Sequence, residues 1–438
     1  MQEHALPTLP SQANQHFMEA LVDLSEHHEI EVSEDIYAHN GTKLLARGSR
    51  VDAKLYERVI NHKLRRPIET TLVSSRAFST KDLCSEAEKL LDEIPLLRSF
   101  CNWSMGRVTP LGMLERVKIS PQAGTLLAVA ESRNAKSRAH LALVALIAAG
   151  LAHSSRYKDP QMLGDIIAAS VFHDIGEIYV DPDFFASSAE ITPLQWQSFA
   201  AHPIIGAALV REVVGLDATC QTAILQHHER IDGIGYPRGV TGSAMSPAAN
   251  VLAIAEVVSS MRGRGCPLHR IDIALKIVPH EFDPAIIRLA HDFLDEQWGR
   301  FEEPYDPASD TTTVDIQKIA DRIEKALELR HEWHVMHPFS PSAQEAIDAA
   351  FERFMCVRRA FTSTGIDGLE ELLPVLGGVE LREVGMESSC VLDEVLWRLT
   401  RLSRDLALKC QSFSETERQE ALRLSNILAG LPDRRLEV

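Results

Sequence analysis

Apolar residues between positions 110 and 300 recur almost throughout at the spacing of helices. The longest apolar run, Leu141 to Ala152, is shorter than the roughly 20 residues of a membrane-spanning helix, so it predicts a buried helix. Thr192 to Gln195 predicts a helix start, because Thr caps, Pro193 fits the first helical position and Gln completes a capping box. This helix is expected to end near Pro203, with His202 at its C-terminal end.

The first hundred residues follow a different pattern, made of short alternating segments. Glu29–Ala38 and Thr42–Val51 alternate as strands do, and Asn40-Gly41 between them predicts a hairpin turn. Residues 68–73 predict a further strand, and helices are expected over 15–31, 51–62 and 79–104. This part is therefore expected to be a small mixed α/β module.

The last hundred residues predict a helical bundle. Its expected core is formed by apolar residues that share a helix face, namely Ile347, Phe351, Phe354, Phe361, Leu392, Val395, Leu399, Leu402 and Leu406. A capping box at Ser414–Glu417 begins the final helix, and Gly430 and Pro432 close it. The whole chain is thus predicted to be mainly α, with a mixed module over 1–105, a helical domain over 106–302, a linker with a helix over 303–341 and a bundle over 342–438.

Composition narrows the class of protein. The chain has 438 residues, and its 45% hydrophobic and 24% charged residues are typical of a globular protein. Its net charge of −17 argues against a broad DNA- or RNA-binding surface, which needs clustered cations. Seven cysteines without a CxxC pair favour a reducing compartment. With no secretory segment or membrane span visible in the sequence, a cytoplasmic location without membrane partners is expected.

Histidines carry the candidate chemistry. Six of them fall between His140 and His228, including the adjacent pairs His173-Asp174 and His227-His228, and Glu256 follows in another apolar stretch. Buried polar groups need partners, and a pair of metal ions would give every member of this set a partner. Separate structural histidines that lie close together by chance explain the set less well. Imidazole and carboxylate suit Fe or Mn, and also Ni, Co or Zn. Asp174 could bridge two ions, with a bridging hydroxide as the nucleophile of a phosphoryl displacement.

The same residues resemble a known family. His173-Asp174-Ile175-Gly176, then His202-Pro203, then His227 to Pro237 with its Gly-Tyr-Pro triplet, are similar to the HD-GYP branch of the HD phosphohydrolases over about residues 135–295. The resemblance implies an all-helical domain that hydrolyses cyclic di-GMP to pGpG or GMP with two or three metals. It also implies that the metal ligands are His140, His173, Asp174, His202, His227, His228 and Glu256, of which His173 and Asp174 are catalytic.

The resemblance further implies that the glycine-rich loop after His228 helps to form the substrate pocket. Its expected substrate-binding residues are Arg230, Asp232, Gly235, Tyr236, Pro237 and Arg238. Arginine can contact phosphate, although solvent exposure explains Arg230 and Arg238 equally well, and Tyr236 could serve only to pack the loop.

This chain departs from the family pattern at four positions. Glu177 stands where the family has the lysine of HDIGK, Glu256 and Ser259 stand where it has the aspartates of AD-x-x-D, and Lys136 replaces a glutamate of the trinuclear relatives. A binuclear centre is therefore expected. The alternatives are a non-catalytic nucleotide receptor or scaffold, or a phosphohydrolase of another nucleotide. A protein partner at the C-terminal bundle and a homodimer are further expectations.

Overall fold

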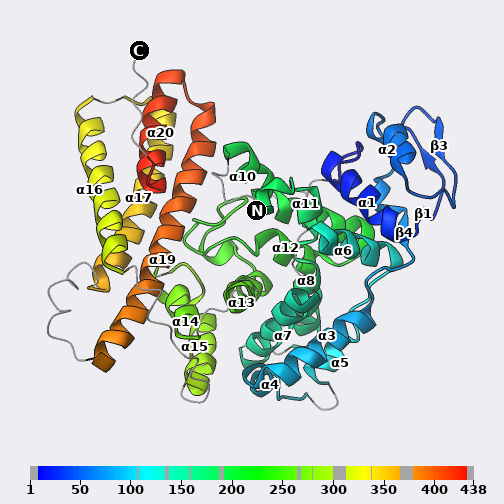
Figure 1. Cartoon of the computed structure of the whole chain (residues 1–438), viewed down its shortest axis with the longest axis horizontal. Helices are drawn as coiled ribbons and strands as arrows, with labels where there is room; N and C mark the ends of the chain where they lie inside the picture. The colour runs from blue at the N-terminus through cyan, green and yellow to red at the C-terminus, as the bar shows by residue number, and fades with distance from the viewer. Residues whose placement is uncertain are drawn as a thin grey trace. The chain divides into compact units, whose positions relative to one another are not determined.

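Figure 1 shows the computed structural model of the chain, which describes residues 8–431 except 106–107, 134–137, 156, 158, 187–191, 264–267, 279, 299–311, 337 and 366–377. Most of these residues are helical and the strands are short, so the predicted mainly α fold is confirmed. Lys136 and most of the predicted linker at 303–313 lie outside the described residues.

Contacts along the chain separate two compact units. The first comprises Met1–Ile191, Ser198–Gly265 and Phe282–Phe293, and the second comprises Thr192–Gln197, Cys266–Glu281 and Leu294–Val438. The division into four parts that the sequence suggests stays a prediction.

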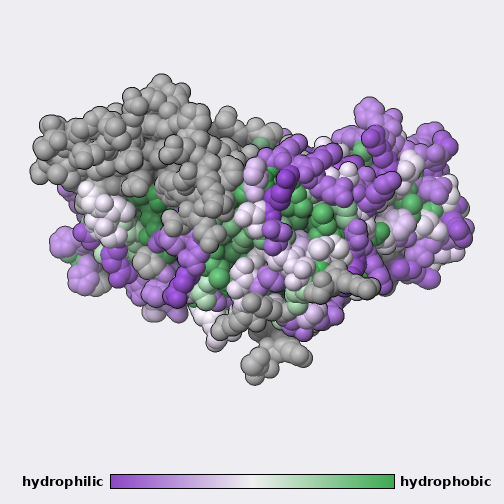
Figure 2. All heavy atoms as spheres, turned by 90° about the horizontal axis from the view of Figure 1, so that it is seen from below, coloured by the Kyte–Doolittle hydropathy of each residue, from purple (hydrophilic) through white to green (hydrophobic). Residues whose placement is uncertain are grey.

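The N-terminal module of the first unit mixes helices with two small sheets. Its elements are α1 (Gln15–His27), β1 (Ile30–Val32), β2 (Ile36–Tyr37), β3 (Lys43–Leu45), α2 (Ala53–Ile60), η1 (Ile68–Thr70) and β4 (Leu72–Ser74). The predicted hairpin is confirmed, because β2 pairs with β3 around Gly41, whose φ of +92° suits glycine. On the face seen in Figure 2, the surface of this module, at the right, is mainly hydrophilic.

The single strand predicted over residues 29–38 is wrong. The chain divides it into β1 and β2, and β1 pairs with the distant β4, so that Val32 lies opposite Leu72. Both of these side chains are fully buried. Burial of one face of each strand favours this pairing over a longer hairpin.

The rest of the first unit is a helical domain. Its elements are α3 (Thr80–Glu93), α4 (Pro95–Phe100), α5 (Pro110–Leu114), α6 (Pro121–Arg133), α7 (Arg138–Ser154), α8 (Pro160–Phe172), η2 (Ile175–Tyr179), α9 (Asp183–Ala186), α11 (His202–Leu209), the π-helical turn η3 (Val210–Val214), α12 (Ala218–Gln226), η4 (Gly242–Ala244), α13 (Pro247–Gly263) and the start of α15 (Pro284–Trp298). Helix α7 packs against α3, α8 and α13. Its residues 142–152 are buried on all sides, which confirms the predicted buried helix.

Among the described residues, no single helix combines the length and the apolar composition that a membrane span requires. The helices α6 and α7 meet both criteria only when they are counted together, and a bend of 113° separates them.

The helix that Thr192 caps is shorter than predicted. Thr192 and Gln195 form the predicted reciprocal cap, and α10 (Pro193–Ala200) then ends before His202. His202 is the first residue of α11, with Pro203 in the first turn, so its predicted place at the end of a helix is wrong. Proline fits there because a first-turn N–H has no partner within the helix.

The second unit contains the predicted bundle. Its further elements are α14 (Leu268–Lys276), α16 (Thr312–Met336), α17 (Pro341–Ser363), α19 (Gly378–Lys409), η8 (Cys410–Ser412) and α20 (Glu415–Ala429). The predicted apolar stripes of α17 and α19 are buried in one core with residues of α16 and α20. Ser414 and Glu417 form the predicted capping box, and Gly430 ends α20 with a φ of +77°.

Candidate metal centre

Seven side chains from five segments converge in the first unit. His140 comes from α7, His173 and Asp174 from the turn between α8 and η2, His202 from the start of α11, His227 and His228 from the end of α12, and Glu256 from α13. His173, His202 and His227 are fully buried, and Asp174 and Glu256 are each 6% exposed. The structure therefore brings together all the ligands that the sequence suggests.

These side chains form two clusters that share Asp174. His140, His173 and Glu256 complete one cluster, and His202, His227 and His228 complete the other. Within each cluster the ligand atoms all lie within 4.8 Å of one another. Asp174 and Glu256 therefore place two carboxylates among five imidazoles.

Each carboxylate oxygen of Asp174 faces a different cluster. Its Oδ2 lies 2.9 Å from Nε2 of His173 and 3.8 Å from Nε2 of His140. Its Oδ1 lies 3.4 Å from Nε2 of both His202 and His227. One short side chain can thus reach into both clusters at once.

Backbone carbonyls hold three of the imidazoles in place. His173 Nδ1 lies 2.8 Å from the Ser170 carbonyl, and His202 and His227 make the same contact with the carbonyl three residues earlier, at 2.8 and 2.6 Å. An Nδ1–H that donates to a carbonyl leaves the Nε2 lone pair free for a metal. In all three residues that nitrogen points toward Asp174.

Strong electrostatic coupling marks the centre. Burial alone would lower the pKa of His173, but the carboxylates of Asp174 and Glu256 outweigh it and raise that pKa to about 10. Burial lowers the pKa of His227 to about 4, with neighbouring histidines adding to the effect. His140 and His173 hold the pKa of Glu256 well below its usual value despite its burial.

The donor set fits divalent metal ions. Nε2 of His140 and Nε2 of His173 lie 3.2 and 3.0 Å from Oε2 of Glu256, and Nε2 of His228 is buried without a hydrogen bond to any described residue. A buried polar atom without such a bond is costly, and converging imidazole nitrogens and carboxylate oxygens suit first-row divalent ions. Thiolate ligands are absent from both clusters.

The glycine-rich loop after His228 is anchored by Glu229. This fully buried carboxylate accepts hydrogen bonds from the backbone N–H groups of Arg238, at 2.7 Å, and Val240, at 3.0 Å. A Cβ on Gly235 would lie 2.2 Å from the Glu229 Cα, so only glycine fits where the loop crosses this segment. The loop conformation is thus built around Glu229, a role that the sequence analysis missed.

The predicted substrate-binding residues occupy different places in this loop. Tyr236 stacks on His228 with ring centroids 4.6 Å apart, and Pro237 follows it through a cis peptide bond. Asp232 accepts a hydrogen bond from the Ile234 N–H within the loop. Arg230 is only 4% exposed, and its guanidinium lies over the Phe282 ring and donates to the Glu229 carbonyl. Arg230 thus packs the loop, whereas Arg238 is exposed.

Replacing Glu229 with Ala is expected to loosen the loop while the histidines stay buried. Both loop N–H groups would lose a charged acceptor, and such a bond contributes about 1.5–3 kcal/mol. Amide hydrogen exchange at Arg238 and Val240 should accelerate at least tenfold, with a smaller increase in Glu229→Gln, which keeps one acceptor. Unchanged exchange in Glu229→Ala would contradict this account of the loop.

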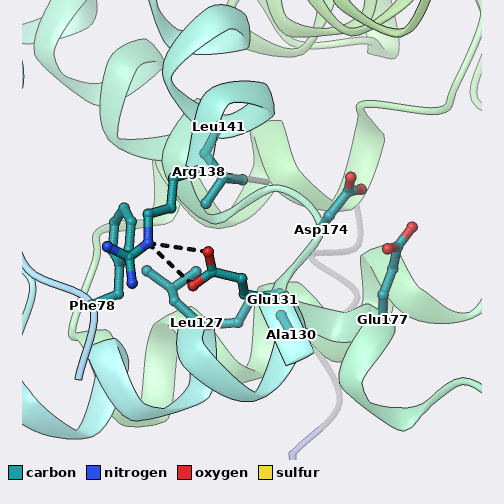
Figure 3. A pocket seen from close by; sticks show the side chains of 9 residues that line it. Phe78, Leu127, Ala130, Glu131, Arg138, Leu141, Asp174 and Glu177 are labelled. Carbon is teal, nitrogen blue, oxygen red and sulfur yellow. Dashed lines mark hydrogen bonds and ion pairs between the residues drawn. The ribbon is translucent and has the colours of Figure 1, made fainter. Parts of the chain in front are cut away.

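Glu177 lies beside Asp174 at the edge of a small hollow. Figure 3 shows both carboxylates on one side of this hollow and the Arg138–Glu131 ion pair on the other. Phe78, Leu127 and Leu141 line its apolar part. The departure at position 177 therefore places a buried negative charge next to the metal centre.

Two serines of α13 support the ligands. Ser259 Oγ lies 3.2 Å from Nδ1 of His140, and Ser260 Oγ donates to Oε1 of Glu256 at 2.6 Å. Ser259 thus contacts a candidate ligand from the position where the family has an aspartate. Its place one helical turn after Glu256 puts it on the same face of α13 as that carboxylate.

All seven candidate metal-centre residues lie in a part of the chain that matches a known protein family. Residues 125–277 match the family model described as HD domain. A "Probable cyclic di-GMP phosphodiesterase" of Vibrio cholerae serotype O1 is 24% identical over 216 residues, which cover 45% of this chain and 46% of that protein. A "Cyclic di-GMP phosphodiesterase" of the same organism is 27% identical, covering 37% of each chain. Its "3'3'-cGAMP-specific phosphodiesterase 1" is 27% identical, covering 23% of each. This chain therefore matches less than half the length of these relatives.

Proposed function

Since the chain carries an HD domain of the HD-GYP family, we propose that it is a metal-dependent phosphodiesterase that hydrolyses cyclic di-GMP to pGpG or GMP. The position of Asp174 is the observation that carries this proposal. Its two oxygens face two clusters of buried nitrogen and oxygen ligands, as a carboxylate that bridges two ions requires. A pair of ions that shared one carboxylate would suit phosphoryl displacement.

We assign two divalent ions to the centre, with Fe or Mn favoured over Ni, Co and Zn. His140, His173 and Glu256 would hold one ion, His202, His227 and His228 the other, and Asp174 both. When bound, the ions supply Lewis acidity toward the phosphate and activate water. Five imidazoles and two carboxylates without sulfur match the preferences of these metals.

The remaining residues would orient the dinucleotide. Tyr236, stacked on His228, offers an aromatic surface at the edge of the centre, and the exposed Arg238 lies two residues farther along the same loop. Asp232, Gly235 and Pro237 shape this loop, and Arg230 supports it from inside. Arg238 is the residue that we assign to a substrate phosphate, because a guanidinium binds phosphate oxygens in pairs.

The proposal is tested by stripping the purified chain with a chelator and reloading it with Mn(II) or Fe(II). Hydrolysis of cyclic di-GMP should vanish on stripping and return on reloading. A fully loaded protein that leaves cyclic di-GMP intact, while an active relative cleaves it under the same conditions, would overturn the proposal. Parallel assays with 3'3'-cGAMP report which dinucleotide is preferred, because relatives named for both substrates match this chain.

The second candidate is a nucleotide receptor without turnover, and Glu177 favours it. A carboxylate beside Asp174 would repel a dianionic substrate where a lysine would attract it. The protein partner at the C-terminal bundle and the homodimer suggested by the sequence remain predictions under either function.

Replacing Glu177 with Lys is expected to raise turnover of cyclic di-GMP by about 10-fold or more, because one tenfold step in rate needs only about 1.4 kcal/mol. Initial rates with Mn(II)-loaded protein measure this change. The turnover of Glu177→Gln, which removes the charge instead of reversing it, should lie between that of the parent and that of Glu177→Lys. A receptor that lost catalysis for other reasons would show no gain in either variant.

A further inference from the structure

The short helix η2 links the metal centre to the N-terminal module. Asp174 immediately precedes η2, and Tyr179 is its last residue. The Tyr179 hydroxyl donates a hydrogen bond to Oε1 of Glu69 in η1, more than one hundred residues earlier in the chain. Glu69 is 1% exposed and Tyr179 is 5% exposed, so this contact lies in the interior.

Other contacts join the same end of η2 to the module. The rings of Phe17 in α1 and Tyr179 lie 6.1 Å apart, and Phe17 is fully buried. Arg133 at the end of α6 donates to the carbonyl of His16, at 2.6 Å, and to that of Ile178, at 3.5 Å. Three elements, α1, η1 and α6, therefore converge on Ile178 and Tyr179.

The opposite end of η2 is fixed against the metal ligands. A Cβ at Gly176 would lie 2.1 Å from the His202 carbonyl oxygen, which shows how closely η2 and α11 approach. Backbone hydrogen bonds from Glu177 to Asp174 and from Val180 to Glu177 run through the segment. Because the helix is short and bonded along its length, a shift at Tyr179 is transmitted to Asp174.

We propose that Glu69 and Tyr179 form a positioning pair through which the N-terminal module holds η2, and with it Asp174, in place for metal binding. The proposal rests on the metal centre assigned above. Glu69 is an expensive group to bury, and its carboxyl needs a directional partner in the interior. Burial raises its pKa, and the Tyr179 hydroxyl partly opposes that rise. An apolar contact would fill the same space without fixing the orientation of η2.

Coupling of this kind is reciprocal. If the module stabilises the arrangement of η2 that binds metal, metal binding must stabilise the contact between η2 and the module by the same free energy. A signal that altered the module would then change metal occupancy without touching a ligand. The Glu69–Tyr179 pair therefore gives the N-terminal module a physical route to the metal centre.

Replacing Tyr179 with Phe tests the pair, since it removes only the hydroxyl. The Mn(II) dissociation constant, measured by titration of metal-stripped full-length protein, should rise about 10-fold, near the low end of typical couplings between two sites. Glu69→Gln, which keeps an acceptor for the hydroxyl, should retain most of the affinity.

Thr125→Val is the matched control. The Thr125 hydroxyl is fully buried and accepts a hydrogen bond from the Ser74 N–H, so it also joins the module to α6, but that contact does not involve η2. Thr125→Val should lower the Tm by a similar amount and leave Mn(II) affinity unchanged. Equal losses of affinity in Thr125→Val and Tyr179→Phe, or none in Tyr179→Phe, would overturn the proposal.

A second readout separates this proposal from the proposed function. In metal-free protein, amide hydrogen exchange at Glu177 and Val180 should accelerate in Tyr179→Phe and stay unchanged in Thr125→Val. This result would support the positioning pair even in a chain that neither binds Mn(II) nor hydrolyses cyclic di-GMP. Unchanged exchange at both amides in Tyr179→Phe would refute it.

Discussion

Replacing Asp174 with Asn should empty the metal centre and abolish hydrolysis. The amide keeps the size of the side chain but removes the charge that serves both clusters, and it offers one oxygen where two face the ligands. We expect bound metal to fall from about two ions per chain to fewer than one, measured by elemental analysis. Turnover should fall by about 1,000-fold or more, a loss of roughly 4 kcal/mol in transition-state stabilisation.

Asp183→Asn is the matched control for this substitution. Asp183 lies at the start of α9, nine residues after Asp174, and its side chain is exposed. It should keep full metal content and turnover, because an exposed carboxylate outside both clusters contributes little to either. Retention of two ions in Asp174→Asn would contradict the bridging role.

Replacing Gly176 with Ala should disrupt the same centre without changing a ligand. The new Cβ would lie 2.1 Å from the His202 carbonyl oxygen and 2.7 Å from the Gly206 nitrogen, and neither backbone atom can move as a flexible side chain does. Overpacking a core costs about 1–3 kcal/mol, and we expect the upper end here. Thermal unfolding should show the loss of stability, and Mn(II) titration should show weaker binding as η2 and α11 separate.

Gly164→Ala provides the comparison. Gly164 lies within α8, where a Cβ would meet no atom within 4 Å. Alanine favours a helix over glycine by about 1 kcal/mol, so this variant should be slightly more stable and bind metal normally. A Gly176→Ala protein as stable as the parent, with normal Mn(II) affinity, would mean that the approach of η2 to α11 is not required.

The sequence, read with its resemblance to the HD-GYP family, was sufficient to name the seven candidate metal-centre residues that the structure brings together. Histidines and acidic residues in apolar surroundings are conspicuous, and their chemistry limits the explanations. Spacing could not reveal how Asp174 divides its oxygens between two clusters, since that depends on how α8, α11 and α12 pack. Nor could it reveal the contact of Ser259 with His140, which lies 119 residues earlier.

Arg230 illustrates why charge alone did not predict position. A cationic residue beside a phosphate site is readily assigned to the substrate, but the structure places this guanidinium over Phe282, far along the chain. Similarly, the pairing of β1 with β4 joins segments about forty residues apart, which no local alternation records. His202 was placed at the wrong helix end because proline both follows one helix and begins the next.

Metal content per chain tests the central claim most directly. The protein should be purified without chelators or a metal-binding tag, reloaded with Mn(II) or Fe(II) where needed, and measured beside Asp174→Asn. The account predicts about two ions per chain in the parent and fewer than one in the variant. A parent that stays empty after reloading would contradict a binuclear centre bridged by Asp174.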